Sequence, residues 1–136
     1  MVEYIYTDFK GGILMALQES GEMYLESIAR LKETKGFVRA IDVCEYMGFS
    51  KPSVSRAMGL LKDGGYITVA KGGGIELTEL GCEVAKKVYE RHVLISSLLK
   101  SIGVNDKTAT DDACKIEHVI SDETFEKLKK YFADKK

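Results

Sequence analysis

The chain has 136 residues, of which 45% are hydrophobic and 30% charged, and its formal net charge is −1. This composition is typical of a soluble globular protein with one domain or two small ones, and it excludes intrinsic disorder and a uniformly basic nucleic-acid-binding surface. No apolar run approaches the roughly 20 residues that span a membrane, and the amino terminus lacks the features of a secretory signal. We therefore expect a cytoplasmic protein that does not associate with membranes.

The predicted elements begin with three helices, over residues 21–31, 39–47 and 51–63, where apolar residues recur at helical spacing. Ser50 is placed to cap the third helix, and Pro52 lies in its first turn, where the missing N–H has no effect. The inward face of the second helix should comprise Ile41, Val43, Cys44 and Met47, and that of the third Val54, Ala57, Met58 and Leu61.

Two short helices joined by a tight turn containing Gly48 are typical of a helix-turn-helix motif. The second helix of such a motif enters the DNA major groove with its amino-terminal residues towards the bases. Here Lys51 could neutralise a phosphate and Arg56 could pair with guanine, while serine hydroxyls allow close approach. The residues expected to contact DNA from this region are Arg39, Ser50, Lys51, Pro52, Ser53, Ser55, Arg56 and Lys62.

Two β-strands are expected next, over residues 66–70 and 75–78, joined by a glycine-rich tip that begins at Lys71. A β-hairpin directly after a recognition helix is a wing, and Lys71 beside three glycines suits contact with phosphate. Each of these motifs also occurs in proteins where the helix pair and the hairpin only pack together and do not bind DNA. Their order along the chain favours DNA binding.

The remainder of the chain is predicted to be helical. A long helix should follow the cap at residues 78–79 and end near Ser101, a second should cover residues 107–120, and a third should begin at Ser121. The apolar side of the last helix should comprise Phe125, Leu128, Tyr131 and Phe132. We expect these helices to form a self-complementary dimer interface, because two-fold symmetric proteins read palindromic DNA.

Charge is distributed unevenly between these regions. Residues 30–71 contain eight Lys or Arg and four acids, a balance of about +4, whereas residues 106–126 contain seven acids and two lysines, a balance of about −5. The first region could face phosphates and the second could attract cations or a partner. Two ordinary solvated surfaces would show the same counts, so charge alone leaves both interpretations open.

Three side chains that bind metals lie close together near the carboxyl terminus. Cys114, Glu117 and His118 occupy positions i, i+3 and i+4, which share one face of a helix. A thiolate, a carboxylate and an imidazole could therefore converge on one ion. The other cysteines, Cys44 and Cys82, match no zinc-finger or disulfide spacing, and we expect both to be reduced and to pack inside.

Several segments of the chain carry a family resemblance. They are Glu22–Glu26, Ser50–Ser55, Leu77–Gly81, Arg91–His92, Ala113–His118 and Ser121–Glu123. In this order, over roughly residues 20–133, they resemble the metal-dependent repressors that include the diphtheria toxin repressor and the manganese transport regulator. The resemblance implies a mainly α fold, in which a winged helix-turn-helix DNA-binding domain precedes an all-helical metal-binding and dimerisation domain.

The domain boundaries that the resemblance implies are 20–80 and 81–136, without the SH3-like third domain of larger family members. Residues 1–19 form an unassigned amino-terminal extension, which could lengthen the first helix, cover the dimer or be partly mobile. The implied protein is a homodimer that binds a palindromic operator in double-stranded DNA. It is not an enzyme, and no small organic ligand is expected.

The resemblance also implies a set of metal ligands. The main site of the iron-responsive branch has Met, Cys, Glu and His at the positions of Met23, Cys114, Glu117 and His118. The manganese-responsive branch has acids at the first two positions and a glutamate at the position of Glu26. His92 matches a ligand position of both branches. Taken singly, Met23 would more often be a core residue, Glu26 solvated and His92 structural, but the chain's only two histidines both match ligand positions.

Thiolate and thioether ligands disfavour Mn(II) relative to Fe(II), Co(II), Ni(II) and Zn(II). We therefore expect Fe(II), with Mn(II) as the alternative because of Glu26, and Co(II), Ni(II) or Zn(II) in vitro. The implied function is a metal-activated repressor of metal-ion homeostasis genes. A winged-helix module that binds protein remains an alternative, as does a metal-dependent hydrolase, although the sequence offers neither a separate general base nor a glycine-rich substrate loop.

Overall fold

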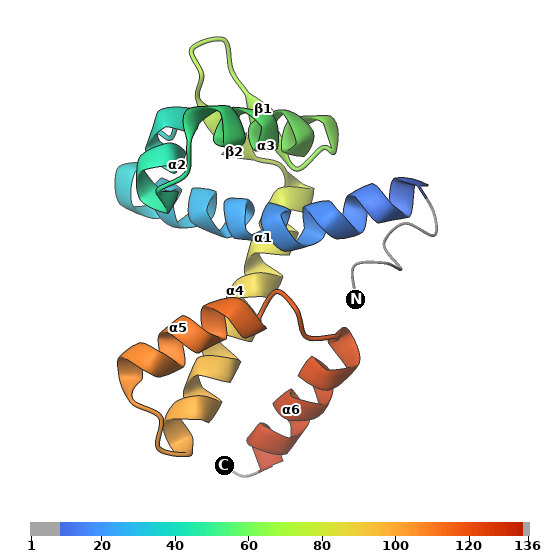
Figure 1. Cartoon of the computed structure of the whole chain (residues 1–136), viewed down its shortest axis with the longest axis vertical. Helices are drawn as coiled ribbons and strands as arrows, with labels where there is room; N and C mark the ends of the chain where they lie inside the picture. The colour runs from blue at the N-terminus through green and yellow to red at the C-terminus, as the bar shows by residue number, and fades with distance from the viewer. Residues whose placement is uncertain (1–8, 135–136) are drawn as a thin grey trace. The chain divides into compact units, whose positions relative to one another are not determined.

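The computed structural model describes residues 9–134, with side chains from Ser20 onward (Figure 1). The elements are α1 (Phe9–Lys35), α2 (Ala40–Met47), α3 (Lys51–Asp63), β1 (Ile67–Val69), β2 (Ile75–Leu77), α4 (Glu79–Ser101), α5 (Asp106–Ile116) and α6 (Asp122–Asp134). They form two compact units, the first extending to Lys86 and the second beginning at Lys87. Within the described range, no helix is both long and apolar enough to cross a membrane.

The helix α1 is longer than the periodicity of residues 21–31 predicts, because it begins at Phe9. Residues 9–19 therefore lengthen the first helix, which is one of the three alternatives for the amino-terminal extension. The other part of that extension, residues 1–8, lies outside the described residues.

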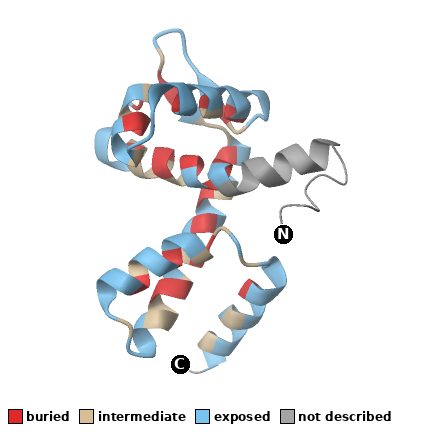
Figure 2. Ribbon diagram, viewed as in Figure 1, coloured by how far each residue is buried: buried red, intermediate tan, exposed pale blue. Residues whose placement is uncertain are grey.

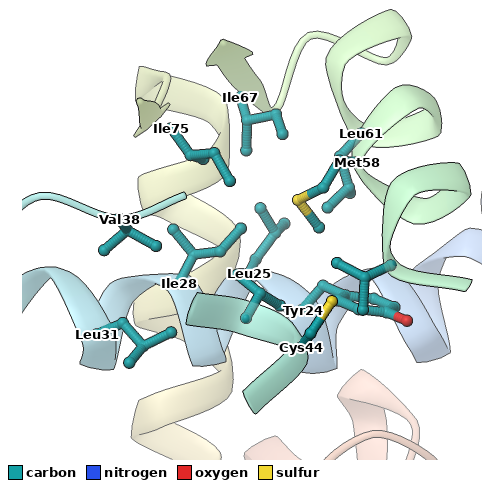
Figure 3. Packing of buried hydrophobic residues seen from close by; sticks show 12 residues of the cluster. Tyr24, Leu25, Ile28, Leu31, Val38, Cys44, Met58, Leu61, Ile67 and Ile75 are labelled. Atoms are coloured by element: carbon teal, nitrogen blue, oxygen red, sulfur yellow. The ribbon is translucent and has the colours of Figure 1, made fainter. Parts of the chain in front are cut away.

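The core of the first unit contains a buried face from α1, α2, α3 and the hairpin (Figure 3). Its buried members are Tyr24, Leu25, Ile28, Leu31, Val38, Val43, Cys44, Val54, Met58, Leu61, Ile67 and Ile75. Residues three and four apart on a helix share one face, so these spacings leave the opposite face of α3 in solvent (Figure 2). The core thus holds a recognition helix with its polar residues outward.

The helix-turn-helix has the predicted turn at Gly48 and the predicted cap at Ser50. α2 ends at Gly48, whose φ of 72° lies in the left-handed region. α3 has the predicted bounds, and the Ser50 hydroxyl accepts a hydrogen bond from the backbone N–H of Ser53 at 3.3 Å. The prediction that Ile41 points inward is wrong, since it is 43% exposed. At about 100° per residue, Ile41 lies roughly 160° around α2 from the buried Val43.

The wing is an antiparallel hairpin in which Ile67 pairs with Leu77 and Val69 with Ile75. Its strands are shorter than the predicted ones. Ile67 and Ile75 are both buried, whereas Thr68, Val69 and Glu76 are exposed. The hairpin therefore anchors one edge of the core and projects its glycine-rich tip away from it.

In the second unit, the buried apolar side chains include Val88 and Ile95 of α4, Ala109 and Ala113 of α5, and Phe125 of α6. Ser121 caps α6, because its hydroxyl accepts from the N–H of Thr124 at 3.1 Å.

Two predictions of buried side chains in α4 and α6 are wrong. Tyr131 is 59% exposed, because it lies about 120° around α6 from Phe125 at 100° per residue. Cys82 is also exposed. It follows Gly81, which is the residue that turns inward at the start of α4.

Candidate metal centre and DNA-binding surface

A buried carboxylate is the centre of the second unit's candidate metal site. The Glu117 side chain is 0% exposed, and its Oε1 lies 2.9 Å from His92 Nδ1. Its other oxygen, Oε2, lies 3.2 Å from His118 Nε2. Cys114 Sγ lies 3.8 Å from His92 Nδ1. The ligand atoms of His92, Cys114 and Glu117 all fall within 4.8 Å of one another.

This geometry corrects the prediction that Cys114, Glu117 and His118 share one face of a helix. The helix α5 ends at Ile116, and Glu117 is its C-cap residue. The chain then tightens, since the N–H groups of His118 and Val119 donate to carbonyl oxygens three residues earlier. Cys114 is therefore the helical member of the trio, and Glu117 and His118 lie on the turn that follows. His92 on α4 lies beside Glu117 and Cys114, although it is more than 20 residues away in sequence.

The donor set fits a divalent transition metal. An ionised carboxylate in a fully buried position is unfavourable unless a cation or hydrogen-bond donors accompany it. Here two imidazoles and a thiol gather around the Glu117 carboxylate. Nitrogen, sulfur and carboxylate donors together suit Fe(II), Co(II), Ni(II) or Zn(II) better than the hard ions Mg²⁺ and Ca²⁺.

Arg91 fastens the turn that carries Glu117 and His118. This side chain is 7% exposed, and its Nη1 donates to the carbonyls of Glu117 at 3.3 Å and Ile120 at 2.9 Å. Its Nη2 donates to Asp122 at the start of α6. Sequence reasoning noted Arg91 only as part of the resemblance and missed this role. Its position directly before His92, together with an acid in the first turn of α6, could have indicated that Arg91 pairs with the start of that helix.

Asp122 also gives this turn a pH-dependent contribution to stability. Its pKa lies below the ordinary value of 3.8, first because Lys87 donates to it and then because of the charge of Arg91. The folded-state pKa is the lower one, so the stabilisation is present above the ordinary value of 3.8 and is lost as the pH falls from there through the lower folded-state value. We expect Asp122→Asn to reduce the free energy of unfolding at pH 7 by at most about 1 kcal/mol, since the carboxylate is largely exposed.

The measurement is urea unfolding of metal-free protein at pH 7 and at pH 3. The difference between wild type and Asp122→Asn should shrink at the lower pH, because the carboxyl in the unfolded chain, with its ordinary pKa of 3.8, is then largely protonated. Glu123→Gln, at the exposed neighbouring position, is the control. A difference that stays constant across this range would contradict the assignment.

The other two predicted ligands, Met23 and Glu26, lie on α1 in the first unit. The Met23 side chain is 37% exposed, which is unusual for a core methionine. Glu26 forms an ion pair with Arg30 at 3.1 Å, one turn later on the same helix. The Glu26 side chain is only 13% exposed, so of these two residues Met23 is the more open to solvent.

The predicted DNA-contacting residues are all exposed. These are Arg39, Ser50, Lys51, Pro52, Ser53, Ser55, Arg56, Lys62 and Lys71. Most lie at the start or on the polar face of α3, and Lys71 lies at the tip of the hairpin. The amino-terminal end of a recognition helix and a basic wing tip are the parts of this motif that approach DNA.

Comparison with known proteins matches both halves of the chain to one family. Residues 16–75 match the N-terminal DNA-binding domain of iron-dependent repressors. Residues 78–136 match the metal-binding and dimerisation domain of the same repressors. The two domains thus follow each other in the expected order.

An HTH-type transcriptional regulator of Methanocaldococcus jannaschii is 35% identical over 115 residues, which cover 83% of this chain and 92% of that protein. The regulator MntR of Listeria welshimeri is 35% identical over 102 residues, covering 75% and 72%. The solved structure of the manganese regulator SloR is 28% identical with a TM-score of 0.72, covering 82% of this chain and 53% of SloR. The chain therefore spans about half the length of that solved relative.

The comparisons agree with the winged helix-turn-helix of the first unit, and they match the second unit to a metal-binding and dimerisation domain. They also place the protein among regulators of transcription and not among enzymes, which sets aside the metal-dependent hydrolase. The chain belongs to the family of metal-dependent transcriptional repressors, whose members join an N-terminal DNA-binding domain to a helical metal-binding and dimerisation domain.

Proposed function

We propose that the protein is a cytoplasmic, homodimeric repressor that is activated by Fe(II) and controls metal-ion homeostasis genes through a palindromic operator. The observation that carries this proposal is the Glu117 carboxylate, which is fully buried between His92 and His118 with Cys114 nearby. The exposed polar face of α3 supports the DNA-binding part of the proposal.

The proposed ligands of the main site are Met23, Cys114, Glu117 and His118, with Glu26 and His92 as further ligands. The thiol of Cys114 and the thioether of Met23 favour Fe(II) over Mn(II). Glu26 and the similarity to a manganese regulator support Mn(II) as the alternative. Co(II), Ni(II) and Zn(II) should also bind in vitro. When bound, the ion would supply the positive charge that neutralises the buried carboxylate.

The residues of this chain would couple the ion to DNA binding because the proposed ligands come from both units. Met23 and Glu26 belong to the helix that packs behind the recognition helix, and the other ligands belong to the second unit. A shared ion would therefore restrict the orientations of the DNA-binding domain. A shift from 1:99 to 99:1 in favour of the active orientation requires about 5.5 kcal/mol of differential binding.

The proposal is tested by DNA binding to a family-type palindrome under anaerobic conditions across a series of divalent metals. We expect binding to require metal, to need the lowest free concentration with Fe(II), and to weaken steeply as salt is raised. Cys114→Ala should abolish the metal dependence. DNA binding that is equal with and without a chelator would contradict the proposal, and absence of DNA binding with every metal would favour the protein-interaction module.

A further inference from the structure

The segment between α1 and α2 lies along the wing. The Val38 carbonyl accepts a hydrogen bond from the backbone N–H of Ile75 in β2 at 2.8 Å. On either side of the buried Val38, the side chains of Phe37 and Arg39 are exposed. The Arg39 guanidinium lies 5.8 Å from the centre of the Phe37 ring. The two exposed side chains thus lie together beside the hairpin.

The three glycines of the wing tip differ in the structural constraint that favours glycine at each position. Gly73 has a φ of 89°, which favours glycine whatever the surroundings. Gly74 has no positive φ, yet a Cβ there would lie 2.7 Å from Cε1 of Phe37. Gly72 has neither constraint, since a Cβ there would meet no atom within 4 Å. Phe37 therefore occupies the space that a side chain at Gly74 would need.

An open pocket lies next to the tip of the wing, and its lining includes Arg39, Ile41, Met58 and Val69 as well as Gly72 and Gly73 of the tip itself. Two backbone hydrogen bonds close the tip, one from the N–H of Ala70 to the Gly74 carbonyl at 2.9 Å and one from the N–H of Gly73 to the Ala70 carbonyl at 2.8 Å. The side-chain atoms nearest to the Cβ positions of Gly73 and Gly74 belong to Arg39 and Phe37, so these two side chains lie directly against the tip.

We propose that Phe37 and Arg39 are positioning residues that hold the wing, and hence Lys71 at its tip, in the position that contacts the DNA backbone. This inference rests on the proposed DNA-binding function. It accounts for an exposed phenylalanine, because the ring lies against Gly74, which carries no side chain. It also adds a role to Arg39, which was expected only to contact DNA.

The test compares Gly74→Ala with its matched control Gly72→Ala in operator binding with metal present. Gly74→Ala should lower the affinity about tenfold, the effect of weakening one or two phosphate contacts, and Gly72→Ala should leave it unchanged. In a Lys71→Ala background, Gly74→Ala should have little further effect, because both changes remove the same contact. Gly74→Ala should also reduce the slope of log affinity against log salt by about one, as Lys71→Ala does.

Native-state hydrogen exchange gives a readout that does not require DNA. The amides of Ala70 and Gly73 should exchange faster in Gly74→Ala and in Phe37→Ala, and at the wild-type rate in Gly72→Ala. Gly74→Ala that binds the operator like wild type, or whose loss of affinity adds fully to that of Lys71→Ala, would overturn the inference while leaving the proposed function intact. Wild-type protein that never binds operator DNA would overturn both.

Discussion

Replacing Glu117 with glutamine is expected to lower the affinity for Fe(II) and Mn(II) by at least about 100-fold, because loss of a ligand should exceed the 10- to 100-fold effect of losing an outer-shell partner. The carboxylate contacts His92 through one oxygen and His118 through the other, and it is fully buried. Glutamine preserves the shape of the side chain but removes its charge. Metal-dependent operator binding should be lost with the metal.

Metal affinity is measured anaerobically by competition with a chelating indicator, and folding by thermal unfolding of the metal-free protein. Glu90→Gln is the matched control, since Glu90 is a half-exposed acid on α4 that pairs with Lys129 at 3.0 Å. A fall in affinity with an unchanged midpoint of unfolding distinguishes loss of a ligand from loss of the fold. If Glu117→Gln bound metal as tightly as Glu90→Gln, Glu117 would not be a ligand of the metal.

Gly81→Ala is expected to destabilise the first unit by about 2–3 kcal/mol, the upper part of the range for overpacked positions. A Cβ at Gly81 would lie 2.1 Å from the backbone oxygen of Tyr66. Neither side of this contact can rotate away, because the same oxygen accepts from the N–H of Thr78, and Gly81 N–H donates to the Thr78 hydroxyl. The gain from replacing a helical glycine, roughly 0.5–1 kcal/mol, is smaller than this clash.

The control is Gly59→Ala in α3, where a Cβ would meet no atom within 4 Å. This change should stabilise the protein by about 0.5–1 kcal/mol, so the two glycine substitutions are expected to have opposite signs. Urea unfolding followed by circular dichroism measures both. The close approach of α4 to the hairpin would be refuted if Gly81→Ala were as stable as wild type.

Local patterns predicted the order of the helices, although α1 begins earlier and α5 ends earlier than expected. The bounds of α3, its cap at Ser50 and the cap of α6 at Ser121 follow from contacts between residues three or four apart, which a single segment contains. The positions of Ile41 and Tyr131 were wrong because an apolar residue was counted as inward without regard to its angle around the helix. Residue type alone therefore did not decide which apolar side chains are buried.

The candidate metal site was predicted in its chemistry but not in its geometry. The proximity of Cys114, Glu117 and His118 in sequence was enough to indicate a metal-binding donor set. The end of α5 at Ile116 was not predictable from that spacing, because it coincides with hydrogen bonds from Arg91, 26 residues earlier, to the turn that follows.

The sequence by itself determined the order of the elements and the polar face of the recognition helix, and it indicated candidate metal-binding side chains, because each depends on neighbours within one or two turns. Only the tertiary structure decided which side chains lie around Glu117, why α5 stops where it does, and which wing glycine is required by packing. Those features depend on contacts between residues far apart in the chain, such as Arg91 with Glu117 and Phe37 with Gly74. The spacing of residues along the sequence does not predict such contacts.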